Sequence, residues 1–310
     1  MGADARDRVG TIDARLGRHA GTSATPPPDV VAECVERALD EDLRPDGDLT
    51  AGLLPEGAVV TAGIGARSAG VLAGSDCATE AFRQVDPDIR VDWRRADGDV
   101  LAAGEVIATV TGPLSSVLTA ERTALNFVGH LSGIATLVAR WVDVAGDGAV
   151  VWDTRKTTPG LRVLEKAAVR AGGGANHRAN LGEWVMIKDN HLFGTDIVSA
   201  VQAARSRWPG RIVHVECDEI SQVARASDAG ADAILLDNMD PAEVRACVDL
   251  VAGLEGEKPL LEASGGITLD VLADYAATGV DCISSGTLTN SAPILDVGLD
   301  MGPDLEGLSG

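Results

Sequence analysis

The residues best suited to chemistry stand at the ends of predicted strands in the second half of the chain. Arg155 and Lys156 follow the first of these strands, and Lys188 follows the second. Glu216 and Asp237 end the third and the fourth, where a carboxylate can accept hydrogen bonds from sugar hydroxyl groups or hold Mg²⁺ through water. Capping of the strand ends is the alternative role of the two acids. Lysines and acids at the same end of one sheet favour a binding site for an anionic ligand.

Two short loops after the fifth and sixth strands are candidate phosphate sites. They are Ser264-Gly265-Gly266 and Ser285-Gly286-Thr287. Each precedes a predicted helix, and a helix N-terminus offers backbone N–H groups to an anion. The late strands of an α/β barrel carry the usual phosphate position. Ordinary capping explains each serine taken singly, but the pair of loops favours a phosphorylated substrate.

A glycine-rich loop lies between the first two of these strands. Gly172-Gly173-Gly174 runs into Asn176-His177-Arg178. The loop lacks the spacing of a P-loop, so the sequence does not indicate a site for nucleoside triphosphates. Flexible backbone next to an imidazole and a guanidinium could instead wrap a small anion. A place in the hydrophobic core is the alternative for His177.

The charge distribution also favours an anionic ligand. The chain carries a net charge of −21, yet residues 151–195 hold seven Lys or Arg and four Asp or Glu, a local balance of +3. Three of the four lysines lie in this window. A cationic patch in a chain that avoids lysine points to an anion, with internal salt bridges as the alternative. The overall charge argues against nucleic acid and anionic membranes as partners, because both would repel the chain.

Alternating strands and helices must position these residues. The predicted strands are Ala149–Trp152, Trp184–Ile187, Ile212–Val215, Ala233–Leu236, Leu260–Ala263 and Cys282–Ser284. The predicted helices are Leu161–Ala171, Asp196–Trp208, Glu219–Ala229, Pro241–Val251 and Leu269–Ala277. Repeated βα units predict a parallel sheet, and the lack of a Rossmann glycine fingerprint favours a barrel. With six or seven strands this α/β barrel is incomplete, and its active site belongs at the C-terminal strand ends.

The first part of the chain predicts a separate α+β sandwich domain. Asp29 is expected to cap a helix over Val30–Asp40, before several strand-like segments. A lipoyl- or biotin-carrier module is excluded, because a carrier needs a lysine at its hairpin tip and residues 1–155 contain none. The expected division is a mobile tail at 1–24, the α+β domain at 25–115, the barrel at 116–290 and a C-terminal tail at 291–310. Residues 297–310 are expected to form a surface tail or to pack on the N-terminal domain.

The remaining composition indicates a cytoplasmic protein. No apolar run reaches the length of a membrane span, and the N-terminus lacks the apolar core of a signal peptide. The five cysteines are scattered without a C-x-x-C pair, so we expect neither a disulfide framework nor a zinc site. A reducing cytosol fits this pattern. The acidic, lysine-poor composition, with 22 Arg and four Lys, indicates either a salt-rich cytoplasm or a compositional bias.

These residues fall in motifs that resemble those of the quinolinate phosphoribosyltransferases. The central block is Asp153-Thr154-Arg155-Lys156-Thr157-Thr158-Pro159-Gly160-Leu161-Arg162, Leu164-Glu165-Lys166, Ala168-Val169-Arg170, Gly172-Gly173-Gly174, Asn176-His177-Arg178 and Ile187-Lys188-Asp189-Asn190-His191. Further matches are Glu121-Arg122-Thr123-Ala124-Leu125-Asn126, Val215-Glu216, Leu236-Asp237-Asn238, Ser264-Gly265-Gly266-Ile267 and 281–288. The resemblance covers residues 29–296, and the central block is its most specific part.

The resemblance implies a fold, an assembly and a reaction. The fold is an N-terminal α/β domain with an incomplete α/β barrel. The assembly is a dimer, a hexamer or another homo-oligomer in which the N-terminal domain of one subunit faces the barrel mouth of the next. The reaction converts quinolinate and phosphoribosyl pyrophosphate, with Mg²⁺, into nicotinate mononucleotide, pyrophosphate and CO₂, on the route to NAD.

The resemblance also implies roles for the site residues. Arg155, His177 and Arg178 would contact the two carboxylates of quinolinate, and Arg122 would reach in from the neighbouring subunit. The two lysines would meet the pyrophosphate, Glu216 and Asp237 would surround the ribose and the metal, and the serine loops would hold the 5′-phosphate. The complete set is Arg122, Thr154, Arg155, Lys156, His177, Arg178, Lys188, Glu216, Asp237, Ser264, Gly265, Gly266, Ser285, Gly286 and Thr287.

Three alternatives remain at this stage. The first is an aldolase- or decarboxylase-type barrel in which Lys188 forms a Schiff base. The second is a relative of the same fold that accepts another ligand, as molybdenum-linked homologues of the family do. Loss of the arginines that bind the carboxylates would favour such a relative, but Arg122, Arg155 and Arg178 are all present. The third is a binding or scaffold protein, which leaves the residues at the strand ends without an explanation.

Overall fold

The structure is a computed structural model that describes residues 25–302. The predicted mobile tail at 1–24 lies outside the described residues, as do residues 303–310. The described chain divides into two compact units. One comprises 140–156 and 173–287, and the other comprises 25–139, 157–172 and 288–302. No helix within 25–302 combines the length and the apolar character that crossing a membrane requires.

The unit that begins with residue 25 is built around an antiparallel sheet. Its strands lie in the order β12 (Val297–Met301), β1 (Val59–Ala66), β5 (Val106–Pro113) and β3 (Arg90–Trp93). Two helices, α2 (Pro28–Leu43) and α3 (Ser75–Val85), pack on each other, and α3 also contacts β3. A short turn of helix, η1 (Ala51–Leu53), and a two-stranded ribbon of β2 (Gly70–Val71) and β4 (Val100–Leu101) complete the sheet domain.

Two details of this unit differ from the sequence analysis. The prediction that Asp29 caps the first helix is wrong, because α2 begins at Pro28 with Pro27 in the cap position. Proline fits the first helical position, where its missing N–H costs nothing, and Asp29 then lies in the first turn. For residues 297–310, the alternative of packing on the N-terminal domain is confirmed over Val297–Met301, because β12 pairs antiparallel with β1.

The helix α4 (Leu114–Ala145) is 32 residues long. Two of its glycines allow close packing. A Cβ atom at Gly133 would lie 2.1 Å from the carbonyl oxygen of Pro293. One at Gly129 would lie 3.0 Å from the side chain of Ile294. The approach of residues 293–295 to α4 therefore requires these two glycines.

The other unit contains a curled sheet of six parallel strands. Their order is β6 (Val150–Trp152), β11 (Cys282–Ser284), β10 (Leu260–Ser264), β9 (Ala233–Asp237), β8 (Val213–Cys217) and β7 (Val185–Ile187). From β7 to β11 each strand pairs with the next strand in the chain, and β6 pairs with β11, so that β6 and β7 form the two edges. This arrangement confirms the predicted incomplete barrel, with six strands and one open seam.

A single core joins the two edges of the sheet and shows that the sheet curls. The buried residues of this core are Val150, Trp152, Ala175, Trp184, Met186, Ala233, Leu235, Leu260 and Cys282. They come from β6 at one edge, from β7 and its preceding residue at the other, and from the strands between. A parallel bridge between Trp152 and Ala175 extends the sheet past β6 into the seam. The loop after the glycine run thus takes the place of a missing strand.

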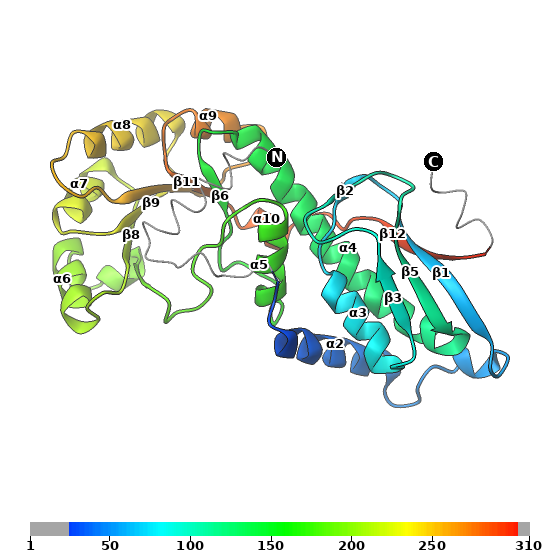
Figure 1. Cartoon of the computed structure of the whole chain (residues 1–310). Helices are drawn as coiled ribbons and strands as arrows, with labels where there is room; N and C mark the ends of the chain where they lie inside the picture. The colour runs from blue at the N-terminus through cyan, green and yellow to red at the C-terminus, as the bar shows by residue number, and fades with distance from the viewer. Residues whose placement is uncertain (1–24, 303–310) are drawn as a thin grey trace. The chain divides into compact units, whose positions relative to one another are not determined.

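Helices cover the outer face of this sheet (Figure 1). They are α6 (Ile197–Arg207), α7 (Ile220–Asp228), α8 (Pro241–Ala252) and α9 (Leu272–Ala276), each near its predicted position. In α8, Asp240 accepts hydrogen bonds from the N–H groups of Ala242 and Glu243, and Pro241 occupies the first turn. This cap fixes the start of the helix directly after β9. Two further helices do not belong to this layer. The helix α5 (Arg162–Ala171) lies in the unit that contains the antiparallel sheet, and the short helix α10 (Thr287–Asn290) follows β11.

Candidate active site

A cavity of about 310 Å³ opens at the C-terminal ends of the barrel strands. Its lining is Thr154, Arg155, Lys156, His177, Arg178, Met186, Lys188, Glu216, Leu235, Asp237, Glu262, Ser264 and Ser284. Residues at the ends of all six strands thus meet in one place, as the strand-end pattern predicts. Nine of the predicted site residues are among them, from Thr154, just after β6, to Ser264 on β10.

Two guanidinium groups face the cavity on one side. Arg178 is only 7% exposed and donates from Nη1 to the carbonyl oxygen of Trp184, 3.3 Å away. Burial lowers the pKa of Arg178 below its usual value, and the nearby charge of Arg155 lowers it further. Two cations with little access to water repel each other, and an anion bound between them would relieve the repulsion. The pair therefore suits a carboxylate, which a guanidinium binds through two parallel hydrogen bonds.

The loop that carries Arg178 is fixed to β6 by a buried carboxylate. Asp153 is 0% exposed and accepts a hydrogen bond from the backbone N–H of His177, 2.8 Å away. It accepts a second one from Nδ2 of Asn176, also 2.8 Å away. The backbone N–H of Asp153 in turn donates to the carbonyl oxygen of Ala175. Asp153 thus sets the position of the His177-Arg178 segment relative to Arg155.

A lysine and a carboxylate pair at the ends of β7 and β8. Nζ of Lys188 donates to Oε2 of Glu216. The side chain of Lys188 remains 42% exposed, whereas that of Glu216 is 15% exposed. Lys188 can therefore reach a ligand in the cavity while Glu216 stays behind it. Ile187 and Val215 lie in register on the paired strands, which places the two side chains side by side.

Strand β9 ends in Asp237, whose side chain is held by Asn238, a residue in the left-handed backbone conformation. Oδ2 of Asp237 accepts a hydrogen bond from Nδ2 of Asn238, 2.7 Å away. Asn238 has φ +56°, and its backbone N–H donates to the carbonyl oxygen of Ser264. Gly265 passes so close that a Cβ atom there would lie 2.3 Å from Oδ1 of Asn238. Its φ of +92° also requires glycine.

Both serine loops precede a helix, as predicted. Ser264-Gly265-Gly266 is followed by α9, which begins at Leu272, three residues after the predicted start at Leu269. Ile267 lies between the loop and the helix and is buried, at 3% exposed. The second loop does lead into a helix, since α10 starts at Thr287, although α10 is only four residues long. Within this loop Oγ of Ser285 accepts a hydrogen bond from the N–H of Thr287 at 3.4 Å.

Six predicted site residues are not in the cavity lining drawn from residues 25–302. They are Arg122, Gly265, Gly266, Ser285, Gly286 and Thr287. The last five belong to the loops that carry or follow the lining serines Ser264 and Ser284, whose hydroxyl oxygens lie 3.0 Å apart. Arg122 is exposed on α4 and lines a cavity of about 870 Å³ within the unit that contains the antiparallel sheet.

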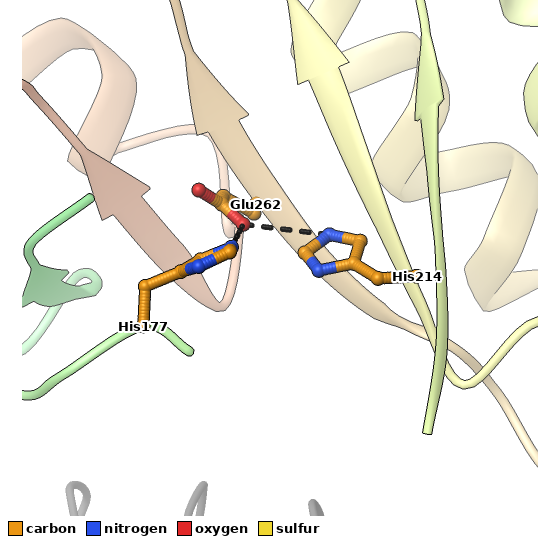
Figure 2. A group of neighbouring side chains, drawn as sticks. All are labelled: His177, His214 and Glu262. Atoms are coloured by element: carbon orange, nitrogen blue, oxygen red, sulfur yellow. Dashed lines mark ion pairs between the residues drawn. The ribbon is translucent and has the colours of Figure 1, made fainter. Parts of the chain in front are cut away.

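Two buried polar residues at the cavity were missed by the sequence analysis, Glu262 in its lining and His214 beside Glu262. His214 on β8 is 0% exposed and Glu262 on β10 is 1% exposed, and both point inward (Figure 2). Burial raises the pKa of Glu262 and lowers the pKa of His214 to about 3. The signal was in the strands themselves, because each residue lies two positions before a predicted site residue and so shares its inward face.

The chain matches two family models that together cover most of its length. The model described as quinolinate phosphoribosyl transferase, N-terminal domain, matches residues 48–132. The corresponding C-terminal domain model matches residues 134–300. These ranges include every predicted site residue.

Relatives and solved structures agree with the family models. Nicotinate-nucleotide pyrophosphorylase [carboxylating] of Mycobacterium leprae is 43% identical over 278 residues, covering 88% of this chain and 98% of the relative. The human protein of that name is 39% identical over 282 residues, covering 89% of this chain and 93% of the relative. The structure of nicotinate-nucleotide pyrophosphorylase from Francisella tularensis has a TM-score of 0.85 at 36% identity, covering 90% of this chain and 98% of that one. The chain therefore belongs to the quinolinate phosphoribosyl transferase family.

Proposed function

We propose that the chain transfers the phosphoribosyl group of phosphoribosyl pyrophosphate to the ring nitrogen of quinolinate and releases pyrophosphate and CO₂. The product is nicotinate mononucleotide, so the enzyme is a pentosyltransferase of NAD biosynthesis. One observation carries the proposal. A small cavity in a chain of this family brings together two guanidiniums, two lysines and the strand-end carboxylates of Glu216 and Asp237, the groups that a planar diacid and a pyrophosphate ester require.

Quinolinate would be held by the guanidinium pair. Arg155 and Arg178 can each bind a carboxylate through two hydrogen bonds, and their mutual repulsion favours a dianion between them. The ring nitrogen must then face the ribose carbon that it attacks. Holding both reactants in that orientation removes much of the entropic barrier to the reaction.

The cations would stabilise the departing pyrophosphate. As the bond to pyrophosphate breaks, the anomeric carbon of the ribose becomes positive and the leaving oxygens become more negative. Lys156 and Lys188 line the same cavity and supply positive charge to those oxygens. The electron pair of the ring nitrogen forms the new bond, and the electrons of the broken bond leave with pyrophosphate.

Loss of CO₂ would follow from the charge on the ring. Once the nitrogen carries the ribose it is positive, and it attracts the electron pair that the adjacent carboxylate leaves behind. The ring carbon then takes up a proton. The chemistry needs no nucleophilic side chain, so the protein contributes position and electrostatics.

We infer that Mg²⁺ accompanies the pyrophosphate. Glu216 and Asp237 fit the ion in chemistry, because both are carboxylates that line the cavity at neighbouring strands. Mg²⁺ prefers six oxygen ligands and keeps several waters, so two carboxylates would be supplemented by phosphate oxygens and water. When bound, the ion neutralises charge on the leaving group. Asp237 would also accept hydrogen bonds from the ribose hydroxyls.

We further infer a homo-oligomer in the cytoplasm with a shared active site. Arg122 is an exposed cation on α4, and an exposed arginine can enter the cavity of a neighbouring subunit as a third guanidinium. The serine loops after β10 and β11 would bind the 5′-phosphate through their hydroxyl and N–H groups. Five free cysteines suit the reducing conditions of the cytoplasm.

The test is turnover with defined substrates. The purified chain is incubated with quinolinate, phosphoribosyl pyrophosphate and Mg²⁺ at low and at molar KCl, and CO₂ and nicotinate mononucleotide are measured. We expect equal amounts of both products, dependent on both substrates. Folded protein that forms neither product at either salt concentration would overturn the proposal.

A further inference from the structure

Three titratable side chains meet at the cavity, and two of them, His177 and Glu262, line it. His214 comes from β8, Glu262 from β10, and His177 from the loop that fills the seam of the barrel (Figure 2). They are 0%, 1% and 6% exposed, respectively. Polar groups this deeply buried destabilise a fold unless hydrogen bonds or a cation compensate them.

The distances within the cluster are too long for good hydrogen bonds. Nε2 of His214 lies 3.4 Å from Oε2 of Glu262, and Nε2 of His177 lies 3.5 Å from the same oxygen. An N–H···O hydrogen bond has an N···O distance of about 2.7–3.2 Å. Within residues 25–302, neither oxygen of Glu262 and neither ring nitrogen of His214 has a partner that meets hydrogen-bond geometry. The carboxyl group of Glu262 therefore lies close to both imidazoles without a short contact to either.

The same distances fit the edges of a tetrahedron around a metal ion. Zinc binds nitrogen and oxygen ligands at about 2.0–2.1 Å, so two ligand atoms of a tetrahedral ion lie about 3.4 Å apart. All three donor atoms of the cluster lie within 4.8 Å of one another. We propose that His177, His214 and Glu262 bind Zn²⁺ or a divalent ion of similar chemistry.

The donor set defines which ions this site takes. Two imidazole nitrogens and one carboxylate suit Zn²⁺, Co²⁺ and Ni²⁺. Mg²⁺ prefers hard oxygen ligands in octahedral geometry, so it does not compete here. The spacing of the cysteines gave no reason to expect zinc, because that argument concerns thiolate ligands only. The ligands here come from three separate segments of the chain.

The neighbouring rings hold the imidazoles in place before an ion arrives. The ring of His177 meets Trp152 and Trp184 edge-on, with centroids 5.1 Å and 4.8 Å away. Trp184 also meets the ring of His214 at 6.0 Å. Metal sites need ligands whose orientation is fixed by their surroundings, and these contacts provide that order.

The cavity gives the ion a way in and a fourth ligand. His177 and Glu262 line the cavity as well as the cluster. Three protein ligands with one open position are typical of zinc sites that bind water or a small molecule. An ion in this site would present its open position to the cavity. The proposal concerns binding alone, so its success or failure does not depend on the proposed reaction.

The experiment uses the full-length chain after treatment with a chelator and exhaustive dialysis. Co²⁺ is titrated while the visible spectrum is recorded, and Zn²⁺ binding is measured by calorimetry with millimolar Mg²⁺ present. We expect one ion per chain and the intense visible bands of tetrahedral Co²⁺, displaced by Zn²⁺. A weak octahedral spectrum, or no stoichiometric binding, would overturn the proposal.

Variants identify the ligands. His214→Gln and Glu262→Gln are each expected to weaken Zn²⁺ binding by at least about 100-fold, since loss even of a residue that supports a ligand costs about 10–100-fold. His130→Gln is the matched control. His130 also faces a buried carboxylate, but Nε2 of His130 and Oε1 of Glu165 lie 2.9 Å apart, a normal hydrogen bond without a third ligand.

The two ligand variants are checked for folding by circular dichroism and thermal unfolding. If either one folds and still binds Zn²⁺ as the wild type does, the assignment of ligands is wrong. If both variants unfold, the visible spectrum of Co²⁺ bound to the wild type still tests the proposal, because tetrahedral Co²⁺ absorbs intensely and octahedral Co²⁺ absorbs weakly. Unchanged binding by His130→Gln is the expected control result, and a loss there would contradict the site.

Discussion

The carboxylate of Asp153 accepts a hydrogen bond from the backbone N–H of His177 across the open seam of the barrel, at 2.8 Å. This contact joins the end of β6, which carries Arg155, to the loop that carries Arg178. Asp153 touches neither substrate in the proposed mechanism and is a positioning residue. Its effect on binding should therefore exceed its effect on the chemical step.

We expect Asp153→Asn to raise the KM for quinolinate about tenfold or more with a smaller change in kcat. The amide keeps the shape of the carboxylate but replaces one acceptor with a donor, so one of the two bonds to His177 and Asn176 is lost at about 1–3 kcal/mol. Steady-state kinetics with each substrate varied in turn measure the split. An equal fall of kcat with both KM values unchanged would assign Asp153 another role.

The guanidinium pair gives the second prediction. Arg155→Ala removes two charge-assisted hydrogen bonds to a carboxylate, a loss of about 3 kcal/mol or about 100-fold in kcat/KM for quinolinate. Arg178→Lys keeps the charge but loses the two-point contact, so it should lose activity as well. Arg225→Ala, an exposed arginine on α7, is the control and should behave as the wild type. Activity of Arg155→Ala within a few-fold of the wild type would refute the carboxylate clamp.

The pairing of Lys188 with Glu216 gives the third prediction, which separates the proposed reaction from Schiff-base chemistry. A Schiff-base lysine attacks through the lone pair of its nitrogen, whereas Nζ of Lys188 is engaged in an ion pair with Glu216. We expect no change in protein mass after treatment with borohydride and a carbonyl compound such as pyruvate. A covalent adduct on Lys188, mapped by mass spectrometry, would favour the aldolase-type alternative.

The strand-end pattern predicted the barrel and most of its cavity because both depend on local signals. Each βα unit has its own apolar run, and the C-terminal ends of parallel strands meet at one edge whatever the loops do. The strand Cys282–Ser284 has the predicted bounds. The polar residues after each strand therefore located the cavity from Thr154 to Ser264 without any knowledge of contacts.

The sequence could not predict what depends on distant partners. His214 and Glu262 share the inward faces of their strands with Glu216 and Ser264, but the sequence does not show that the two side chains lie 3.4 Å apart. The pairing of β12 with β1 joins residues more than two hundred positions apart, and the glycines and acids after Pro293 resemble a loop. The predicted helix Leu269–Ala277 differs from α9 only at its ends, because helix ends are set by local contacts that the apolar pattern does not show.

The fourth prediction concerns thiol reactivity and its dependence on pH. All five cysteines are free and buried. Burial raises the pKa of Cys77 and Cys217 to about 12 and that of Cys247 to about 11, so at pH 8 only about one thiol in a thousand or fewer is a reactive thiolate. Native protein should therefore react slowly with a thiol reagent at pH 8 and faster as the pH rises.

Cys34 is expected to react first, because it lines the larger cavity. Burial raises its pKa as well. Cys34→Ser should remove the first phase of labelling and leave the rest unchanged, and denaturant should expose all five thiols. Rapid labelling of Cys77 or Cys217 in the native protein would show that these thiols are not buried as described.

The last prediction tests the contribution of the C-terminal strand. β12 pairs with β1 from Val297 to Met301, and Nη2 of Arg67 binds Oδ1 of Asp300 at 2.7 Å. A chain that ends at Asp296 loses these contacts and leaves β1 as an unpaired edge, which favours aggregation. The lost hydrogen bonds total about 3 kcal/mol, so thermal unfolding should shift down by about 6–12 °C relative to a chain that ends at Gly302. Equal unfolding temperatures and equal solubility of the two chains would show that β12 adds nothing to the stability of the sheet.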